Sequence, residues 1–217
     1  MSILRELDWL QVISHYQLRV RIHERLLELY QQEGKTDFCE LVLGISDSDS
    51  NYSAAEHGLG PRIWGSNPNI VGRLSELARQ FIELKNARTV PELIRAQSLK
   101  YLQIGVGSEI SCLLNPTVCW VANTRTLWAH LLITHNDNVN KANEALMLYR
   151  DPDAESEMSY QKWSALHAEL NPTMTRLAED GEQSARRDGL TPGTLKFLWA
   201  DAIASELYEK YVSGKSL

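Results

Sequence analysis

Arg125 and His130 are the residue pair with the clearest potential for chemistry, because they stand in the pattern Arg-x4-His inside the most apolar long segment of the chain. An imidazole can take up or release a proton near neutral pH, and a guanidinium can stabilise negative charge that develops on a reacting group. On one straight helix the two side chains would lie about 140° apart around the axis. Joint action would therefore need a distorted turn or a second copy of the chain.

The spacing of Arg125 and His130 resembles the motif of the HEPN superfamily, whose helical and often dimeric members include many metal-independent ribonucleases. The resemblance implies that His130 moves a proton at the ribose 2′-hydroxyl and that Arg125 stabilises the phosphate, with two protomers facing one cleft. It covers six residues, and Thr126 stands where the family often has Asn, His or Asp. The alternative interpretation is a core helix with a snorkelling Arg125 and with His130 on its polar stripe.

A second candidate site lies in the segment of residues 45–67, which is rich in Ser, Asp, Asn, Gly and Pro. Glu56 and His57 are adjacent there, and a histidine beside a carboxylate can do acid–base work because its pKa lies near neutrality. Arg62 and Trp64 follow, and the Trp indicates that the end of the segment docks on something. A loop this long is usually functional or disordered. We therefore expect an irregular binding loop that presents these four residues, although the same residues could be plain solvent-exposed side chains.

Two polar patterns resemble ligand sites without completing them. The run from Asp47 to Asn51 opens like a calcium loop, but Tyr52 and Gly58 occupy positions that require Gly and Glu. We interpret it as a polar turn. Gly105-Val-Gly107-Ser108 could place backbone N–H groups on an anion, but it lacks the preceding strand of a nucleotide-binding motif. A hinge between helices is the better interpretation.

The cysteines indicate reduced thiols rather than disulfides or metal ligands. Cys39, Cys112 and Cys119 are odd in number, and no zinc-binding spacing exists among Cys and His. We therefore predict no metal site and no cofactor. Together with an N-terminus that lacks the apolar core of a signal peptide, this indicates a cytoplasmic protein.

Helical periodicity dominates the whole chain and predicts the elements that would hold these residues. Asn115 is a suitable N-cap and Pro116 a suitable first helical residue, so the spacing predicts a buried central helix over 116–135. Leu and Ile recur at helical spacing over 2–33, which predicts a first helix of about 45 Å. That length suits a bundle or a subunit contact, and the helix could protrude as an association element.

No strand pattern and no internal repeat is present, so we predict an all-α fold. It would be a single domain, 1–217, in the form of a multi-helix bundle of about eight helices around the central helix. Asn171-Pro172 repeats the cap-and-proline signal and predicts a separate helix from there to Arg187, after one over 155–170.

Charge and composition narrow the possible partners. A net charge of −6 argues against duplex DNA, which requires a surface rich in Lys and Arg. Arg19, Arg21 and Arg25 cluster early in the chain, but Glu24 and Glu28 dilute them, which predicts a solvated face. No apolar run approaches the roughly 18 residues of a membrane span, so no membrane contact is expected.

The hypothesis that the sequence favours is a non-catalytic helical subunit or adaptor that acts through protein–protein association and forms a homo-oligomer or docks a protein partner. The first helix and the 45–67 segment would be its contacts. RNA would be a partner only under the alternative, a dimeric HEPN-like ribonuclease that uses Arg125 and His130.

Overall fold

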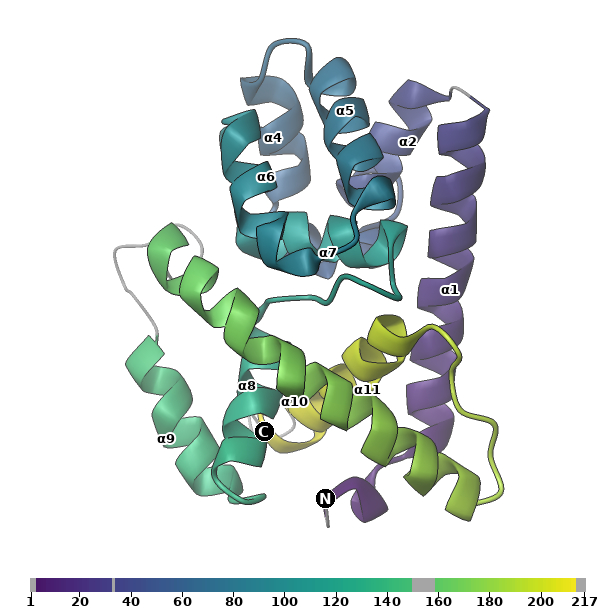
Figure 1. Cartoon of the computed structure of the whole chain (residues 1–217), viewed down its shortest axis with the longest axis vertical. Helices are drawn as coiled ribbons and strands as arrows, with labels where there is room; N and C mark the ends of the chain where they lie inside the picture. The colour runs from purple at the N-terminus through teal and green to yellow at the C-terminus, as the bar shows by residue number, and fades with distance from the viewer. Residues whose placement is uncertain (1–2, 33, 150–158, 214–217) are drawn as a thin grey trace. The chain divides into compact units, whose positions relative to one another are not determined.

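The computed structural model describes residues 3–32, 34–149 and 159–213, and in this part of the chain it contains helices and no strand (Figure 1). The prediction of an all-α fold is confirmed. The described residues form eleven α-helices: α1 (Trp9–Gln31), α2 (Lys35–Val42), α3 (Tyr52–Glu56), α4 (Leu59–Ser66), α5 (Ile70–Glu83), α6 (Val90–Gln97), α7 (Ile104–Leu114), α8 (Thr124–Thr134), α9 (Val139–Tyr149), α10 (Tyr160–Arg187) and α11 (Lys196–Tyr211). Three 3-10 helices, η1 (Ile3–Glu6), η2 (Ser48–Ser50) and η3 (Ala87–Thr89), complete them.

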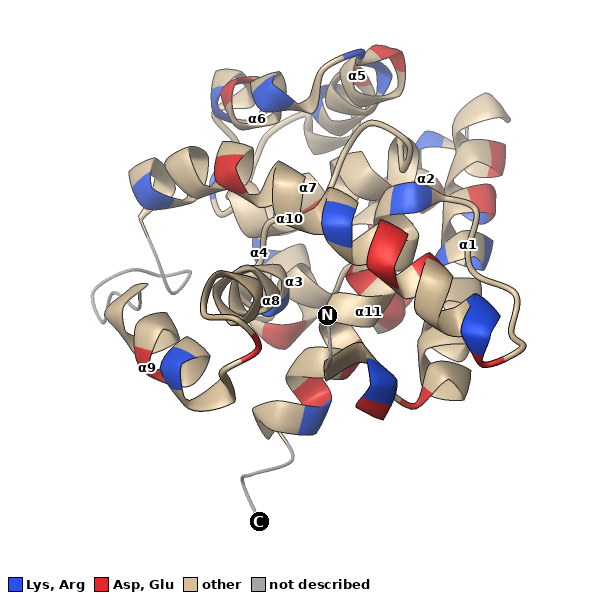
Figure 2. Cartoon of the chain, turned by 60° about the horizontal axis from the view of Figure 1, so that its bottom comes forward, with Lys and Arg blue, Asp and Glu red and all other residues tan. Residues whose placement is uncertain are grey.

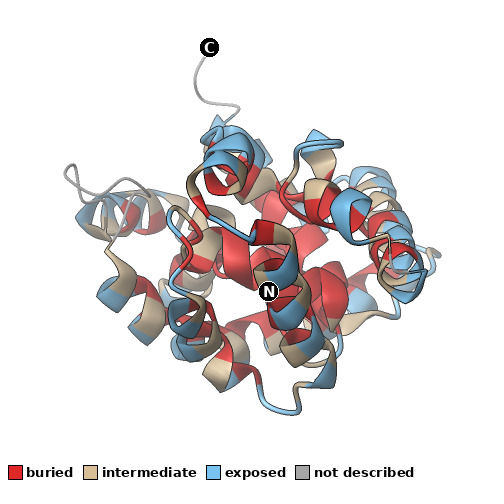
Figure 3. Cartoon of the chain, turned by 90° about the horizontal axis from the view of Figure 1, so that it is seen from above, coloured by how far each residue is buried: buried red, intermediate tan, exposed pale blue. Residues whose placement is uncertain are grey.

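The chain divides into two compact units, and residues of α1 belong to both. The middle unit comprises residues 18–121. Within it, α7 packs against α3, α5 and α6, and α5 also packs against α2. The fully buried side chains of this unit include Phe38, Ile63, Leu77 and Phe81. The helices keep their buried residues on their inner sides and their exposed residues on their outer sides (Figure 3).

The terminal unit comprises residues 1–17 and 122–217 and is built around α8, which packs against α9, α10 and α11. Trp128 of α8 is fully buried, and its indole N–H donates to Asn143 Oδ1 at 2.7 Å. The ring of Tyr208 meets it edge-on and the ring of Tyr211 stacks on it, at centroid distances of 6.1 and 6.2 Å. The prediction that this Trp-bearing helix is buried is confirmed for α8.

A second aromatic cluster joins the start of α1 to α11 within the terminal unit. Trp199 stacks on Trp9 at 5.8 Å and meets Tyr16 edge-on at 5.6 Å. The Tyr16 hydroxyl accepts the N–H of Leu195 at 3.0 Å, at the point where α11 begins. Gly193 packs against the Tyr16 ring, and a Cβ there would lie 2.6 Å from a ring carbon. Only glycine leaves room for this contact.

The predicted start of the central helix at Pro116 is wrong. Residues 116–123 are not helical although Cys119 to Ala122 are buried, and α8 begins at Thr124. Asn123 is the N-cap, because its Oδ1 accepts the N–H groups of Arg125 and Thr126. Asn115 instead caps the end of α5 from a distant part of the chain. Its side-chain amide donates to the Phe81 and Leu84 carbonyls, at 3.0 Å each.

The first helix is shorter than the sequence predicted. The chain starts with η1 and then enters α1 after Asp8, whose carboxylate accepts the N–H groups of Leu10 and Gln11. This N-cap sets the start of α1 at Trp9. The predicted ends at residues 2 and 33 lie outside the described residues.

The separate helix predicted from Pro172 is also wrong. α10 runs without interruption from Tyr160 to Arg187, with Pro172 inside it. Proline lacks the N–H that would bond to the carbonyl of Ala168, so this turn loses a hydrogen bond. Buried side chains on both sides of it, Leu170 and Met174, continue the apolar face across the proline. The predicted start of the preceding helix at Glu155 lies outside the described residues.

Candidate functional site

Arg125 lies in the first turn of α8 and is directed to α11. Its side chain is 20% exposed, and Nη2 lies 3.8 Å from the Glu209 carboxylate. The capping contacts of Asn123 fix the turn that carries it. This ion pair places the half-buried Arg125 guanidinium against α11 within the terminal unit.

His130 is half-buried one and a half turns further along α8 and is bound from α10. Its Nδ1 lies 2.7 Å from Thr173 Oγ1, within hydrogen-bonding distance. Burial lowers the pKa of His130, and the Glu169 carboxylate opposes this effect only in part. Burial therefore favours the neutral form of this imidazole. Arg125 and His130 are thus held toward different helices, α11 and α10.

The prediction of an irregular loop over 45–67 is wrong, because η2, α3 and α4 occupy most of this segment. Asn51 Oδ1 accepts the N–H of Ala54 at 2.9 Å and caps α3. Asn67 closes α4 by donating to the Ile63 carbonyl at 2.7 Å, and its Oδ1 accepts the N–H of Lys100 at 2.8 Å. The polar residues that favour a loop here act as helix caps.

The four residues predicted for a binding loop lie on this helical segment. Glu56 and His57 are exposed at the end of α3, and Trp64 is half-buried on α4. The Arg62 guanidinium lies over the Tyr101 ring, 4.1 Å from its centroid, and so makes a cation–π contact. Of the four, Arg62 has a clear structural role in this unit.

The segment is fixed to the rest of the middle unit by a buried ion pair between two residues that were not predicted to form a site. Arg19 is fully buried rather than part of a solvated face, and its Nη2 lies 2.8 Å from Glu109 Oε1 on α7. Arg19 also donates to the Asp49 carbonyl at 3.0 Å. Glu109 accepts the N–H groups of Tyr52 and Ser53, at 3.0 Å each, at the start of α3. We call this arrangement the Arg19–Glu109 anchor.

The sequence does contain a signal for this anchor. Arg19 falls on the apolar stripe of α1, seven residues after Val12 and seven before Leu26, both of which are buried. Glu109 is the only charged residue between Ile104 and Leu114. A charge at a core position must be paired when it is buried.

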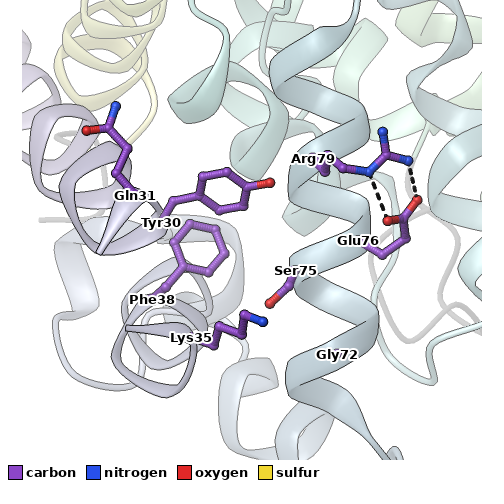
Figure 4. Close-up of a pocket in the computed structure, with 8 residues that line it drawn as sticks. All are labelled: Tyr30, Gln31, Lys35, Phe38, Gly72, Ser75, Glu76 and Arg79. Carbon is purple, nitrogen blue, oxygen red and sulfur yellow. Dashed lines mark hydrogen bonds and ion pairs between the residues drawn. The ribbon is translucent and has the colours of Figure 1, made fainter. Parts of the chain in front are cut away.

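A pocket of about 510 Å³ lies between α1, α2 and α5 of the middle unit (Figure 4). It is lined by Tyr30, Gln31, Lys35, Phe38, Gly72, Ser75, Glu76 and Arg79. Its volume is in the range of small-molecule sites. No spacing in the sequence marks these residues as a site, because they come from two stretches, 30–38 and 72–79, that are far apart along the chain.

The cysteine thiols are not set up for nucleophilic chemistry. Cys39, Cys112 and Cys119 are free and buried, as the sequence predicts for reduced thiols. Burial raises the pKa of Cys39 and of Cys119 to about 12. A thiol with such a pKa is protonated at neutral pH and is a poor nucleophile.

Charged residues of both signs occur along α10 (Figure 2). Glu179, Asp180 and Glu182 form an acidic group in its second half, and Arg186 and Arg187 follow in its last turn. Within the described ranges, no group of three or more His, Cys, Asp or Glu side chains is placed to hold a metal ion. In the same ranges, every helix is too short or too polar to cross a bilayer.

No protein-family model matches the chain, and neither a curated protein nor a solved structure does. What the protein does must therefore be inferred from its own residues.

Proposed function

We propose that the protein acts by association rather than by catalysis, as a helical subunit or adaptor whose first partner is a second copy of the chain. The observation that supports this proposal is the exposure of large apolar side chains in the terminal unit. Leu148 and Met147 of α9 are 83% and 60% exposed, and Leu10 of α1 is 68% exposed. Adjacent apolar side chains left in water are typical of contact surfaces.

The last turns of α9 favour a second copy as the partner. The stretch from Ala145 to Tyr149 contains no charged residue. The chain carries a net charge of −6, so contacts between most surfaces of two copies are opposed by repulsion. The uncharged last turns of α9 from two copies can contact each other without that repulsion. Methionine adapts its shape to a partner and is enriched in interfaces.

The test is sedimentation velocity of the wild type and of two single variants over a range of concentrations. The wild type should rise from the monomer mass of 24.6 kDa toward twice that value. Leu148→Glu should remain monomeric if α9 forms the contact, because a buried unpaired carboxylate opposes association. Leu10→Glu should likewise remain monomeric if α1 forms the contact.

Matched controls separate the apolar contact from a change in net charge. Asn140→Glu on α9 and Gln17→Glu on α1 add the same charge at exposed polar positions, and we expect them to associate like the wild type. A wild type that stays monomeric at every concentration would overturn self-association.

The ribonuclease alternative makes the opposite prediction for the wild type. Single-stranded RNA is incubated in EDTA with the wild type and with His130→Ala. The association proposal predicts that neither cleaves it. Cleavage by the wild type that is lost in His130→Ala would reject a non-catalytic role.

A further inference from the structure

The pocket between α1, α2 and α5 offers a binding site that is independent of the apolar surfaces on α9 and α1. We propose that it binds a small aromatic monocarboxylate. The inference is based on the aromatic wall of the pocket, on one cation that has no partner among the described residues, and on the charge balance of α5.

The apolar side of the pocket is an aromatic wall. Tyr30 and Phe38 meet edge-to-face, with centroids 5.7 Å apart and ring planes at 61°. Phe38 is only 1% exposed, so its ring is held in place by the core beneath it. A flat aromatic ligand would therefore stack on the half-buried Tyr30 ring, which the buried Phe38 ring holds in place from within the core.

Lys35 supplies the positive charge. It is the first residue of α2 and is exposed, and no hydrogen bond or ion pair joins it to another described residue. Figure 4 shows its ammonium group facing Ser75 across the space between α2 and α5. The Ser75 hydroxyl already donates to the Val71 carbonyl at 2.7 Å. Lys35 is therefore the group that would bind a carboxylate here.

Arg79, the other cation of the pocket, is already neutralised. It binds Glu76 through two hydrogen bonds, at 2.7 and 3.0 Å, and Glu83 at 2.7 Å. These carboxylates raise its pKa further above the usual range. The three side chains together carry one negative charge. They would repel a dianion such as a phosphate monoester more than a monoanion, so the charge balance favours a carboxylate.

The test measures the binding of three probes by isothermal titration calorimetry: 2-naphthoate, the uncharged 2-naphthalenemethanol and 2-naphthyl phosphate. The wild type should bind naphthoate more tightly than either analogue. Lys35→Gln should weaken naphthoate binding by about two- to fivefold, as expected for an exposed ion pair. It should leave the alcohol unchanged, and Lys35→Arg should retain naphthoate binding.

A second variant tests the cavity without touching the charge. Ser75→Met fills the space from α5 and should abolish binding of all three probes, while thermal melting by circular dichroism shows that the variant is folded. Failure of the wild type to bind naphthoate would overturn the proposal. Equal binding of acid and alcohol, tighter binding of the phosphate, or normal binding by Ser75→Met would also overturn it.

Discussion

Burial of Arg19 and Glu109 removes two full charges from water. Each charged group is contacted by its partner and also by backbone groups. The carboxylate accepts two backbone N–H groups at the start of α3, and the guanidinium donates to a carbonyl of the η2 turn. The Arg19 guanidinium also lies 5.2 Å from the centre of the Tyr52 ring. Removal of either partner of this buried pair would leave the other charged and buried without its counter-charge.

We predict that Arg19→Met and Glu109→Gln each lower the free energy of unfolding by about 3 kcal/mol. The double variant should lose clearly less than the sum, because neither charge is then left alone. Urea unfolding followed by circular dichroism measures all three. The control is Arg25→Met, which removes an exposed partner of Glu28 and should change stability little. Strictly additive losses would show that the two residues do not interact.

At the scale of elements, α4 shows how tightly the 45–67 segment is packed. Gly60 of α4 lies against the end of α2, and a Cβ there would be 2.3 Å from the Leu43 carbonyl oxygen. Gly65, on the same helix, faces open space, with nothing within 4 Å. Of the two glycines in this short helix, Gly60 thus has no room for a Cβ atom, whereas Gly65 has room for one.

We predict that Gly60→Ala destabilises the protein by about 1–3 kcal/mol, because backbone rather than a flexible side chain must move. Gly65→Ala should stabilise it by up to about 1 kcal/mol, since alanine is the better helix former. Urea denaturation of both variants against the wild type is the measurement. Equal effects of the two substitutions would mean that α4 is not docked on α2.

The helical class could be predicted from periodicity, but several boundaries could not, because the same local signal occurs at more than one place. Asn115-Pro116 and Asn123 both fit a helix start, and the chain uses only the second. Asn115 is bound to α5 carbonyls through contacts far apart in sequence. In the same way, the polar residues of the 45–67 segment indicated a loop because the buried partners that order it, Arg19 and Glu109, are remote from it.

At the scale of the whole molecule, a buried histidine links stability to pH. His167 on α10 is fully buried, and this burial lowers its pKa from 6.5 to about 4. Between these values the unfolded chain binds a proton that the folded protein does not. Acid therefore favours the unfolded state in this window, and above about pH 6.5 the effect is absent.

We predict that the wild type loses about 3 kcal/mol of stability through His167 as the pH falls from 6.5 to about 4. His130, whose pKa burial also lowers, contributes with the same sign. The measurement is urea unfolding at a series of pH values for the wild type and His167→Gln. The free energy of unfolding of the wild type minus that of His167→Gln should fall by about 3 kcal/mol as the pH decreases from 6.5 to about 4. A difference that does not vary with pH would contradict the assignment.

The Arg19–Glu109 anchor also affects when the chain can fold during its synthesis. Arg19 leaves the ribosome long before Glu109 is synthesised, so a nascent chain that already contains η2 and α3 has a core cation without its counter-charge. The middle unit can close only after α7 has emerged. A chain truncated before Glu109 should accordingly be a poor folding unit and a substrate for chaperones.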